Sequence, residues 1–132
     1  MEKTDSASLK KLKKLFKERF NIDLYWYKDV FSRTDGWFTW NDKEYQVEVK
    51  CRRFKKDHYP TTIINEDKYN VLKDKGILVV MFNDCWGICK NVESAYLKTT
   101  AMYARSTTDF GGEYRWSNKV ELDLNKFKWY EY

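Results

Sequence analysis

The sequence predicts an α/β protein, and three stretches carry that prediction. Residues 8–20 have the spacing of an amphipathic helix, consecutive extended segments follow within residues 22–52, and residues 77–82 form an unbroken apolar run. The chain has 132 residues, about the size of one ordinary domain. Apolar residues make up 42% of it and aromatic residues 18%, enough to build a core despite 34% charged residues. We therefore expect a single domain over residues 1–132.

The first predicted element is a helix over residues 8–20, SLKKLKKLFKERF. Ser8 is suited to N-capping, and the leucine and phenylalanine residues at 9, 12, 15, 16 and 20 share one apolar stripe. The opposite face carries five lysines, which fits either a solvated face or one that contacts phosphates.

Three strands are predicted next. Residues 22–31 and 37–40 are rich in aromatic residues, and the turn SRTDG (32–36) separates them. In KEYQVEVKCR (43–52) the odd positions are mostly apolar and the even positions are all polar or charged. Successive side chains of a strand point to opposite faces, so we expect a half-buried strand with a charged ridge. The short links between the three strands predict an antiparallel meander.

The second half of the chain is predicted from weaker signals. Apolar residues within 61–75 lie near helical spacing and predict a second helix, ended by Gly76 in the C′ role. The run ILVVMF (77–82) is typical of a strand covered on both faces, and NDCWGIC predicts a tight turn into a fifth strand. Residues 92–118 show no sustained period and are predicted to be mostly loop. The ending KVELDLNKFKWYEY alternates enough for one or two strands, so residues 92–132 are expected to form a C-terminal β extension.

Charge and cysteine content limit the class of protein. Lysine and arginine number 25 against 20 acidic residues, which favours a polyanionic partner such as nucleic acid, although a moderately basic surface without such a partner is equally common. The three cysteines lack paired CxxC spacing and accompany a single histidine, which argues against a disulfide framework and a zinc site. The sequence lacks an apolar signal core and any run of about 18 apolar residues, so we expect a cytoplasmic protein with no membrane partner.

The candidate catalytic feature is the triplet Glu48-Val49-Lys50. In a strand, Glu48 and Lys50 leave the same side, and Asp35, thirteen residues before Glu48, is expected to meet Glu48 across the hairpin. Adjacent carboxylates raise each other's pKa unless a hard divalent cation such as Mg²⁺ neutralises them. Lys50 could then orient a metal-activated water or balance charge on a pentacovalent phosphate, which suits phosphodiester hydrolysis. A second triplet, EDK (66–68), lies on the predicted second helix, where its charges cannot share a face.

At this point the sequence resembles the PD-(D/E)XK nuclease superfamily. TDG (34–36) followed by VEVK (47–50) stands where that family has its metal-binding aspartate and its (D/E)XK triplet, with spacing similar to archaeal-type Holliday-junction resolvases and VRR-type nucleases. The resemblance covers roughly residues 9–91 and implies a restriction-endonuclease-like αβββαβ core, with a mixed central sheet flanked by helices. The sequence departs from the family at Thr34, which replaces the proline, and at Gly36, which we expect to loosen the strand.

The resemblance implies a Mg²⁺ site in which Mn²⁺ can substitute. Asp35, Glu48 and the main-chain carbonyl of Val49 would bind the metal, and Lys50 would be the catalytic lysine. Many family members add a glutamate from the first helix, where Glu18 is the acid that this chain offers. Glu18 lies away from the apolar stripe, so a solvated surface position fits it equally well.

The loop after the catalytic strand is the best candidate for DNA contact. Basic groups follow phosphates, and the interleaved Phe54 and Tyr59 could stack on unpaired bases or wedge into a distorted duplex. A flexible charged loop with no partner is the alternative. The basic residues of this loop are Arg52, Arg53, Lys55, Lys56 and His58. The second helix of related nucleases often places a polar residue near the active site, and Lys68 is the candidate here for a nucleic-acid contact, or else an exposed lysine.

We therefore predict a Mg²⁺-dependent deoxyribonuclease that hydrolyses phosphodiester bonds, with branched, Holliday-junction-like DNA as one candidate substrate. Two alternatives are a nuclease-derived DNA-binding module that no longer cuts and a protein-interaction domain in which the triplet is accidental. A resolvase that cuts two strands symmetrically needs a homodimer, and the aromatic tail of this chain could serve as its interface or as core.

Overall fold

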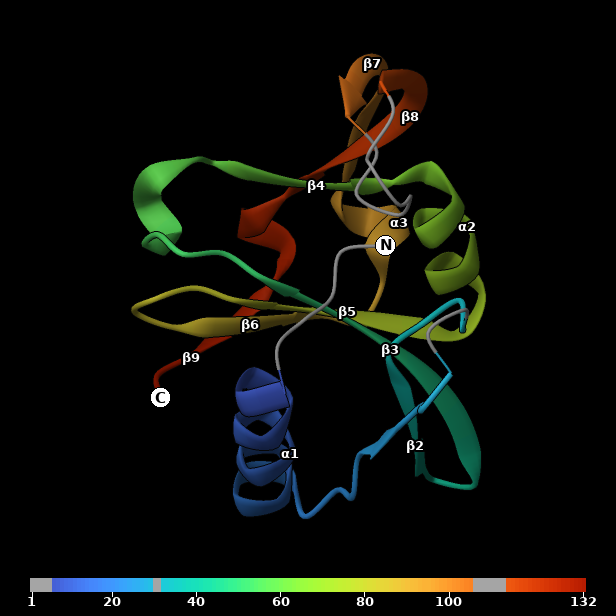
Figure 1. Cartoon of the computed structure of the whole chain (residues 1–132). Helices are drawn as coiled ribbons and strands as arrows, with labels where there is room; N and C mark the ends of the chain where they lie inside the picture. Colours follow the sequence, from blue (N-terminus) through green and yellow to red (C-terminus); the bar gives the residue numbers. More distant parts are fainter. Residues whose placement is uncertain (1–5, 30–31, 106–113) are drawn as a thin grey trace.

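The structure is a computed structural model that describes residues 6–29, 32–105 and 114–132 (Figure 1). Its helices are α1 (Ser6–Phe20), α2 (Glu66–Lys75) and α3 (Val92–Ala95), with 3-10 turns η1 (Lys56–His58) and η2 (Leu124–Lys126). Its strands are β1 (Tyr25–Trp26), β2 (Gly36–Trp40), β3 (Lys43–Cys51), β4 (Thr61–Asn65), β5 (Gly76–Met81), β6 (Trp86–Cys89), β7 (Tyr96–Arg105), β8 (Tyr114–Asp123) and β9 (Lys128–Tyr130).

Within the described residues the strands form two sheets. The main sheet has six strands in the order β1-β2-β3-β5-β6-β9, and a smaller sheet has three in the order β4-β8-β7. The main sheet is mixed, because β3 and β5 are parallel whereas its other neighbouring pairs are antiparallel. These observations confirm an α/β fold with a mixed sheet and the antiparallel meander β1-β2-β3.

Two apolar cores lie on the two faces of the main sheet. On one face, Leu12 and Phe16 of α1 pack with Val47 and Val49 of β3. On the other face, the smaller sheet and α2 cover Leu78 and Val80 of β5. Figure 1 shows α1 on one side of the main sheet and β4, β7 and β8 on the other. β5 is therefore buried along its whole length, as its continuous apolar run predicts.

Residues 61–65 form strand β4, so the prediction of one helix over 61–75 is wrong in its first third. Thr62 and Ile64 are buried while Ile63 is 40% exposed, a period of two rather than of a helix turn. β4 pairs with β8, from Thr61 opposite Asp123 to Asn65 opposite Lys119. The β-branched run TTII favours a strand once β8 is available to pair with it, and α2 begins only at Glu66.

Gly76 ends α2 but does not take the predicted C′ conformation. Its φ of −125° and ψ of 161° are extended, and it is the first residue of β5. A Cβ atom at this position would lie 2.5 Å from Leu72 Cδ2 and 2.9 Å from Leu72 Cα. Glycine is needed here because the start of β5 passes closely against the last turn of α2.

The predicted loop over 92–118 contains α3, β7 and the first half of β8, so that prediction is wrong for the described part of the segment; residues 106–113 lie outside the described residues. β7 and β8 form a long antiparallel hairpin. The exposed part of this hairpin carries large aromatic side chains and few buried ones. Its sequence therefore lacks the regular alternation of apolar and polar residues by which a strand is predicted. The predicted C-terminal strands are confirmed by the end of β8 and by β9, which joins the main sheet next to β6.

The first predicted strand is shorter than expected, since within 22–29 only Tyr25–Trp26 form a strand; residues 30 and 31 lie outside the described ranges. The N-terminal helix is confirmed, with Leu12 and Phe16 buried and its lysine face exposed. No helix in the described part of the chain is long and apolar enough to cross a membrane.

Candidate active site

A tight hairpin sets the register that brings Asp35 to β3. β2 and β3 are joined by Asn41 and Asp42, whose φ values of 51° and 63° are those of a two-residue type I′ turn. The resulting register pairs Gly36 with Val47, so Asp35 lies one position before the start of β2 and beside the middle of β3.

Three hydrogen bonds to backbone groups hold Asp35 in place. Its backbone N–H donates to the carbonyl of Val47 at 3.0 Å, and its own carbonyl accepts from the N–H of Tyr27 at 3.0 Å. Its side-chain Oδ2 accepts from the backbone N–H of Val49 at 2.7 Å. The carboxylate is therefore anchored directly over the residue that follows Glu48, before any ligand binds.

Glu48 is buried, with an exposed fraction of 3%, so part of the predicted charged ridge of β3 lies inside the protein. It faces the smaller sheet, opposite to Val47 and Val49, as strand alternation requires. Burial and then the nearby Asp35 carboxylate raise the pKa of Glu48 from 4.5 to about 8, and a hydrogen bond between the two carboxyl groups adds to the effect. Asp35 and Glu48 thus form a close acidic pair, one member of which is poorly solvated.

Two lysines flank this pair and oppose the rise in pKa. Lys68 of α2 places Nζ 3.8 Å from Glu48 Oε2, and Lys50 leaves β3 on the same face as Glu48. Both lower the pKa of Glu48, Lys68 more than Lys50, but the effect of burial is larger. Lys68 also donates to the carbonyl of Arg33, and its side chain is only 12% exposed. An exposed lysine, one of the two expectations for Lys68, is therefore excluded.

The segment before Asp35 is fixed by a small polar network. The hydroxyl of Thr34, which is 4% exposed, donates to Gln46 Oε1 at 2.7 Å. Tyr27 donates to the same oxygen at 3.0 Å, and the amide nitrogen of Gln46 donates to Glu44 at 3.1 Å. Thr34 stands where the nuclease superfamily that this sequence resembles has proline. Here the hydrogen bond of the threonine hydroxyl, rather than a proline ring, fixes the turn.

Gly36 tightens the hairpin instead of loosening it, contrary to our expectation. A Cβ atom there would lie 2.3 Å from the carbonyl oxygen of Tyr25 and 2.6 Å from Trp26 Cε3. Glycine thus lets β1 and the Trp26 ring pack directly on the residue that follows Asp35.

Glu18 is not brought to the acidic pair. It lies on the exposed side of α1, with a 61% exposed side chain and an ion pair to Lys14 at 3.8 Å. α1 packs on the face of the main sheet opposite to Glu48, so the role of further ligand predicted for Glu18 is wrong for this arrangement. The solvated position is the correct one.

The basic loop leaves β3 just beyond Lys50. Arg53, Lys55 and His58 are exposed, and Arg52 Nη2 donates to the carbonyl of Ile63 at 3.1 Å. Lys56 is half-buried, with Nζ 4.8 Å from the centre of the Trp129 ring. The aromatic residues of the loop pack together, with the ring of Phe54 4.9 Å from His58 and 5.5 Å from Tyr59. The loop is thus a packed basic and aromatic surface that continues from the strand carrying Glu48.

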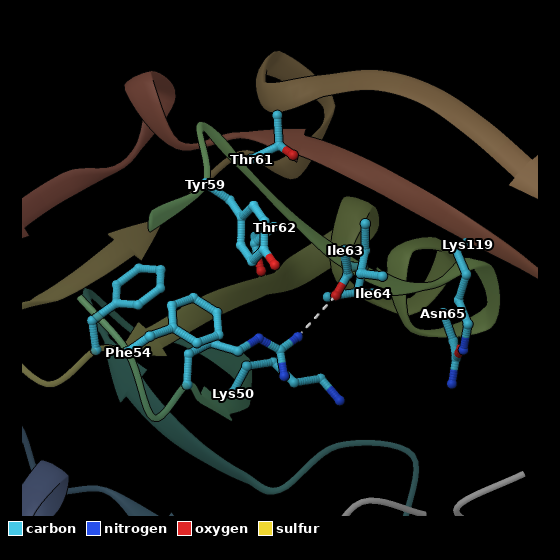
Figure 2. Close-up of a pocket in the computed structure, with 11 residues that line it drawn as sticks. Lys50, Phe54, Tyr59, Thr61, Thr62, Ile63, Ile64, Asn65 and Lys119 are labelled. Atoms are coloured by element: carbon cyan, nitrogen blue, oxygen red, sulfur yellow. Dashed lines mark hydrogen bonds between the residues drawn. The ribbon is translucent and has the colours of Figure 1, made fainter. Parts of the chain in front are cut away.

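A cavity of about 590 Å³ opens between the two sheets at this position, and we call it the inter-sheet cleft (Figure 2). It begins at Lys50, two residues beyond Glu48 on the same strand face. Its lining residues are Lys50, Arg52, Phe54, Tyr59, Thr61, Thr62, Ile63, Ile64, Asn65, Phe82 and Lys119. Lys119 and the β4 residues are not among the predicted site residues, because the sequence predicts a helix over residues 61–65. The β-branched run TTII was the signal that could have indicated a strand there.

The donor set fits a hard divalent cation that keeps most of its water. Within the described residues no group of three or more His, Cys, Asp or Glu side chains gathers. Asp35 and Glu48 nevertheless meet, and Mg²⁺ is commonly held by one or two carboxylates together with waters and substrate phosphate oxygens. A cation there would also offset the repulsion that raises the pKa of Glu48.

Comparison with known proteins adds no relative. No protein-family model matches the chain, and no significant match was found among curated proteins or solved structures. The function of this chain therefore has to be inferred from the chemistry of its site.

Proposed function

We propose that this protein is a metal-dependent deoxyribonuclease that hydrolyses phosphodiester bonds, built on a restriction-endonuclease-like core. The observation that carries the proposal is the meeting of Asp35 and Glu48, with Lys50 and Lys68 beside them. The resemblance of TDG and VEVK to the PD-(D/E)XK pattern supports the same reaction. Branched DNA of the Holliday-junction kind is one candidate substrate.

The residues divide the work by their chemistry. Asp35, Glu48 and the carbonyl of Val49 would hold Mg²⁺, or Mn²⁺ in its place. When bound, such a cation would activate water and stabilise negative charge on the attacked phosphate. Lys50 supplies a positive charge at the open side of the pair, where charge develops on the phosphate. Lys68 and the backbone N–H of Val49 hold the two carboxylates in position before substrate arrives.

The test is cleavage of branched and linear DNA in Mg²⁺ and Mn²⁺. Replacing Lys50 or Glu48 by alanine should lower the rate by about 100-fold or more, the usual effect of losing one charge-stabilising group. Lys68→Ala should cost roughly 10- to 100-fold, as for a residue that orients a metal ligand.

Two matched controls use the same kinds of residue elsewhere. Lys43→Ala removes a charge from the exposed start of β3, and Glu18→Ala removes the acid of α1; both should leave the rate nearly unchanged. Cleavage that survives Lys50→Ala and Glu48→Ala would refute the proposal. Salt-sensitive DNA binding with no cleavage in either metal would instead identify a nuclease-derived binding module.

A further inference from the structure

The inter-sheet cleft has the charge of a phosphate-binding site. Its described lining residues include three cations, Lys50, Arg52 and Lys119, and no acid. They come from both sheets, since Lys119 belongs to β8, where its Nζ donates to the side chain of Asn65. Figure 2 shows Lys50 and the Asn65–Lys119 pair at different sides of the same cavity. Cations that converge from two walls select an anion lying between them.

The cleft also offers an aromatic surface and polar groups. Tyr59 is 55% exposed at the rim, and its ring packs edge-on against Phe54, which fixes its orientation. On β4 the hydroxyl of Thr62, a residue 6% exposed, has no hydrogen-bond partner among the described residues. Thr62 thus places a buried polar group without a protein partner in the wall of the cavity, where a bound water or a polar ligand would satisfy it.

The size of the cleft selects between single and double strands. About 590 Å³ lies within the range of roughly 300–1,000 Å³ for sites that hold one small ligand. A cavity of this volume can take a nucleotide-sized part of an unpaired strand, whereas a duplex, with two backbones and stacked base pairs, is far larger than such a cavity.

We propose that the inter-sheet cleft binds an unpaired segment of a nucleic-acid strand. Its phosphates lie on Lys50, Arg52 and Lys119, and an unpaired base stacks on Tyr59. Because Lys50 lies two positions from Glu48 on one strand face, roughly 7 Å along β3, a strand in the cleft brings a phosphate to the acidic pair. The part of this inference that concerns cleavage rests on the proposed function, and it makes the substrate DNA that is single-stranded next to the cut.

Binding without cleavage tests the cleft separately from the catalysis. Fluorescence anisotropy in EDTA should show that a labelled single-stranded oligonucleotide binds at least about tenfold more tightly than its blunt duplex. Lys119→Ala should weaken single-strand binding and reduce the slope of log affinity against log salt by about 0.7, the value for one lost phosphate contact. Lys43→Ala, which removes the same charge outside the cleft, should change neither.

The aromatic contact has its own pair of variants. Tyr59→Ala should weaken single-strand binding by about fivefold to 150-fold, whereas Tyr59→Phe, which keeps the ring, should bind nearly as the parent does. Competition with a free mononucleotide and with inorganic phosphate distinguishes a strand site from a small-molecule site. Competition by the mononucleotide at concentrations equal to the oligonucleotide would overturn the strand assignment.

Further outcomes separate the two proposals. Equal affinity for single strand and duplex, or an unchanged salt slope in Lys119→Ala, would overturn the inference even if the protein cuts DNA. Thermal unfolding of each variant shows whether the fold is kept, and Lys119→Arg, which retains charge, should restore binding if Lys119→Ala alters the fold. Single-strand binding that follows these expectations, with no cleavage in Mg²⁺ or Mn²⁺, would uphold the cleft and refute the nuclease.

Discussion

At the scale of single residues, Glu48 is the group whose burial destabilises the metal-free site most. Its carboxyl is buried beside Asp35, and the two lysines that approach it do not restore an ordinary pKa. Proteins place such groups where a ligand later compensates the cost, so the unfavourable arrangement of the metal-free protein is consistent with a cation-binding role. Thr62 shows the same feature more weakly on the opposite wall.

Glu48 should make the metal-free protein less stable as the pH rises. Because the pKa is raised in the folded state from 4.5 to about 8, the folded state binds this proton more tightly, and stability falls between these two pH values. Glu48→Gln removes the titration and should be more stable than the parent by a few kcal/mol at about pH 9, with little difference near pH 5, since one pKa unit is worth about 1.4 kcal/mol. Urea unfolding in EDTA measures this. Glu44→Gln, on the exposed end of the same strand, is the control, and parallel pH curves for parent and Glu48→Gln would contradict the prediction.

Gly36 should tolerate no side chain. Alanine there would place Cβ 2.3 Å from the carbonyl oxygen of Tyr25, which belongs to the backbone and cannot move without unpairing β1. We expect a loss of about 1–3 kcal/mol in the free energy of unfolding, as for other overpacked sites, together with weaker cleavage because Asp35 is the preceding residue. Chemical unfolding of Gly36→Ala against Thr39→Ala, an exposed position of β2, provides the measurement; equal stabilities would show that β1 adapts freely.

At the scale of elements, the sequence predicted well those segments whose side chains alternate against a complete partner. The predictions of β3 and β5 are correct because their apolar residues, Val47 and Val49 in one and the run 77–82 in the other, are themselves the buried ones. The tight hairpin is also correct, so the approach of Asp35 to Glu48 was predictable. β4 was mistaken for helix because Thr61–Asn65 become a strand only through pairing with β8, some sixty residues later, a partner that local periodicity does not reveal. Because β4 forms the second wall of the inter-sheet cleft, the cleft was not predicted either.

The strand assignment of residues 61–65 can be tested through two neighbouring isoleucines. Ile64 is 2% exposed and Ile63 is 40% exposed. Ile64→Ala should cost about 2–5 kcal/mol in unfolding free energy because it leaves a cavity in the core between the sheets, whereas Ile63→Ala should cost about 1 kcal/mol or less. Equal losses measured by urea unfolding would contradict the alternation that defines β4.

At the scale of the whole molecule, the last strand of the C-terminal β extension, β9, belongs to the main sheet, whereas β7 and β8 belong to the smaller one. β9 pairs with β6, and the Tyr130 ring stacks on Trp86 at 4.8 Å. Trp129 lies so close to Gly87 that a Cβ there would be 2.5 Å from its ring. Tyr132 donates its hydroxyl to the carbonyl of Phe82 at 2.6 Å. Trp129 and Tyr130 are therefore partly buried and pack against the two cores, whereas Tyr132 is 42% exposed.

Removing residues 128–132 should destabilise the protein and expose the edge of β6. An uncovered edge strand pairs readily with another chain, so we expect the shortened protein to unfold at lower urea concentration and to form oligomers in size-exclusion chromatography with light scattering. Tyr132→Phe, which removes only one hydrogen bond, should lose about 0.5–1.5 kcal/mol and keep the oligomeric state of the parent. A shortened protein with the stability and size of the parent would show that β9 is dispensable.

The separation of paired strands along the chain also bears on how the molecule assembles. The β2–β3 hairpin closes over two residues, but β4 must find β8 across the interval between Thr61 and Asp123. Loop-closure entropy favours the short-range pairing first and makes distant strand pairings slow. The hairpin that carries the acidic pair is therefore expected to pair before the smaller sheet, so that the second wall of the inter-sheet cleft is completed only when β4 pairs with β8.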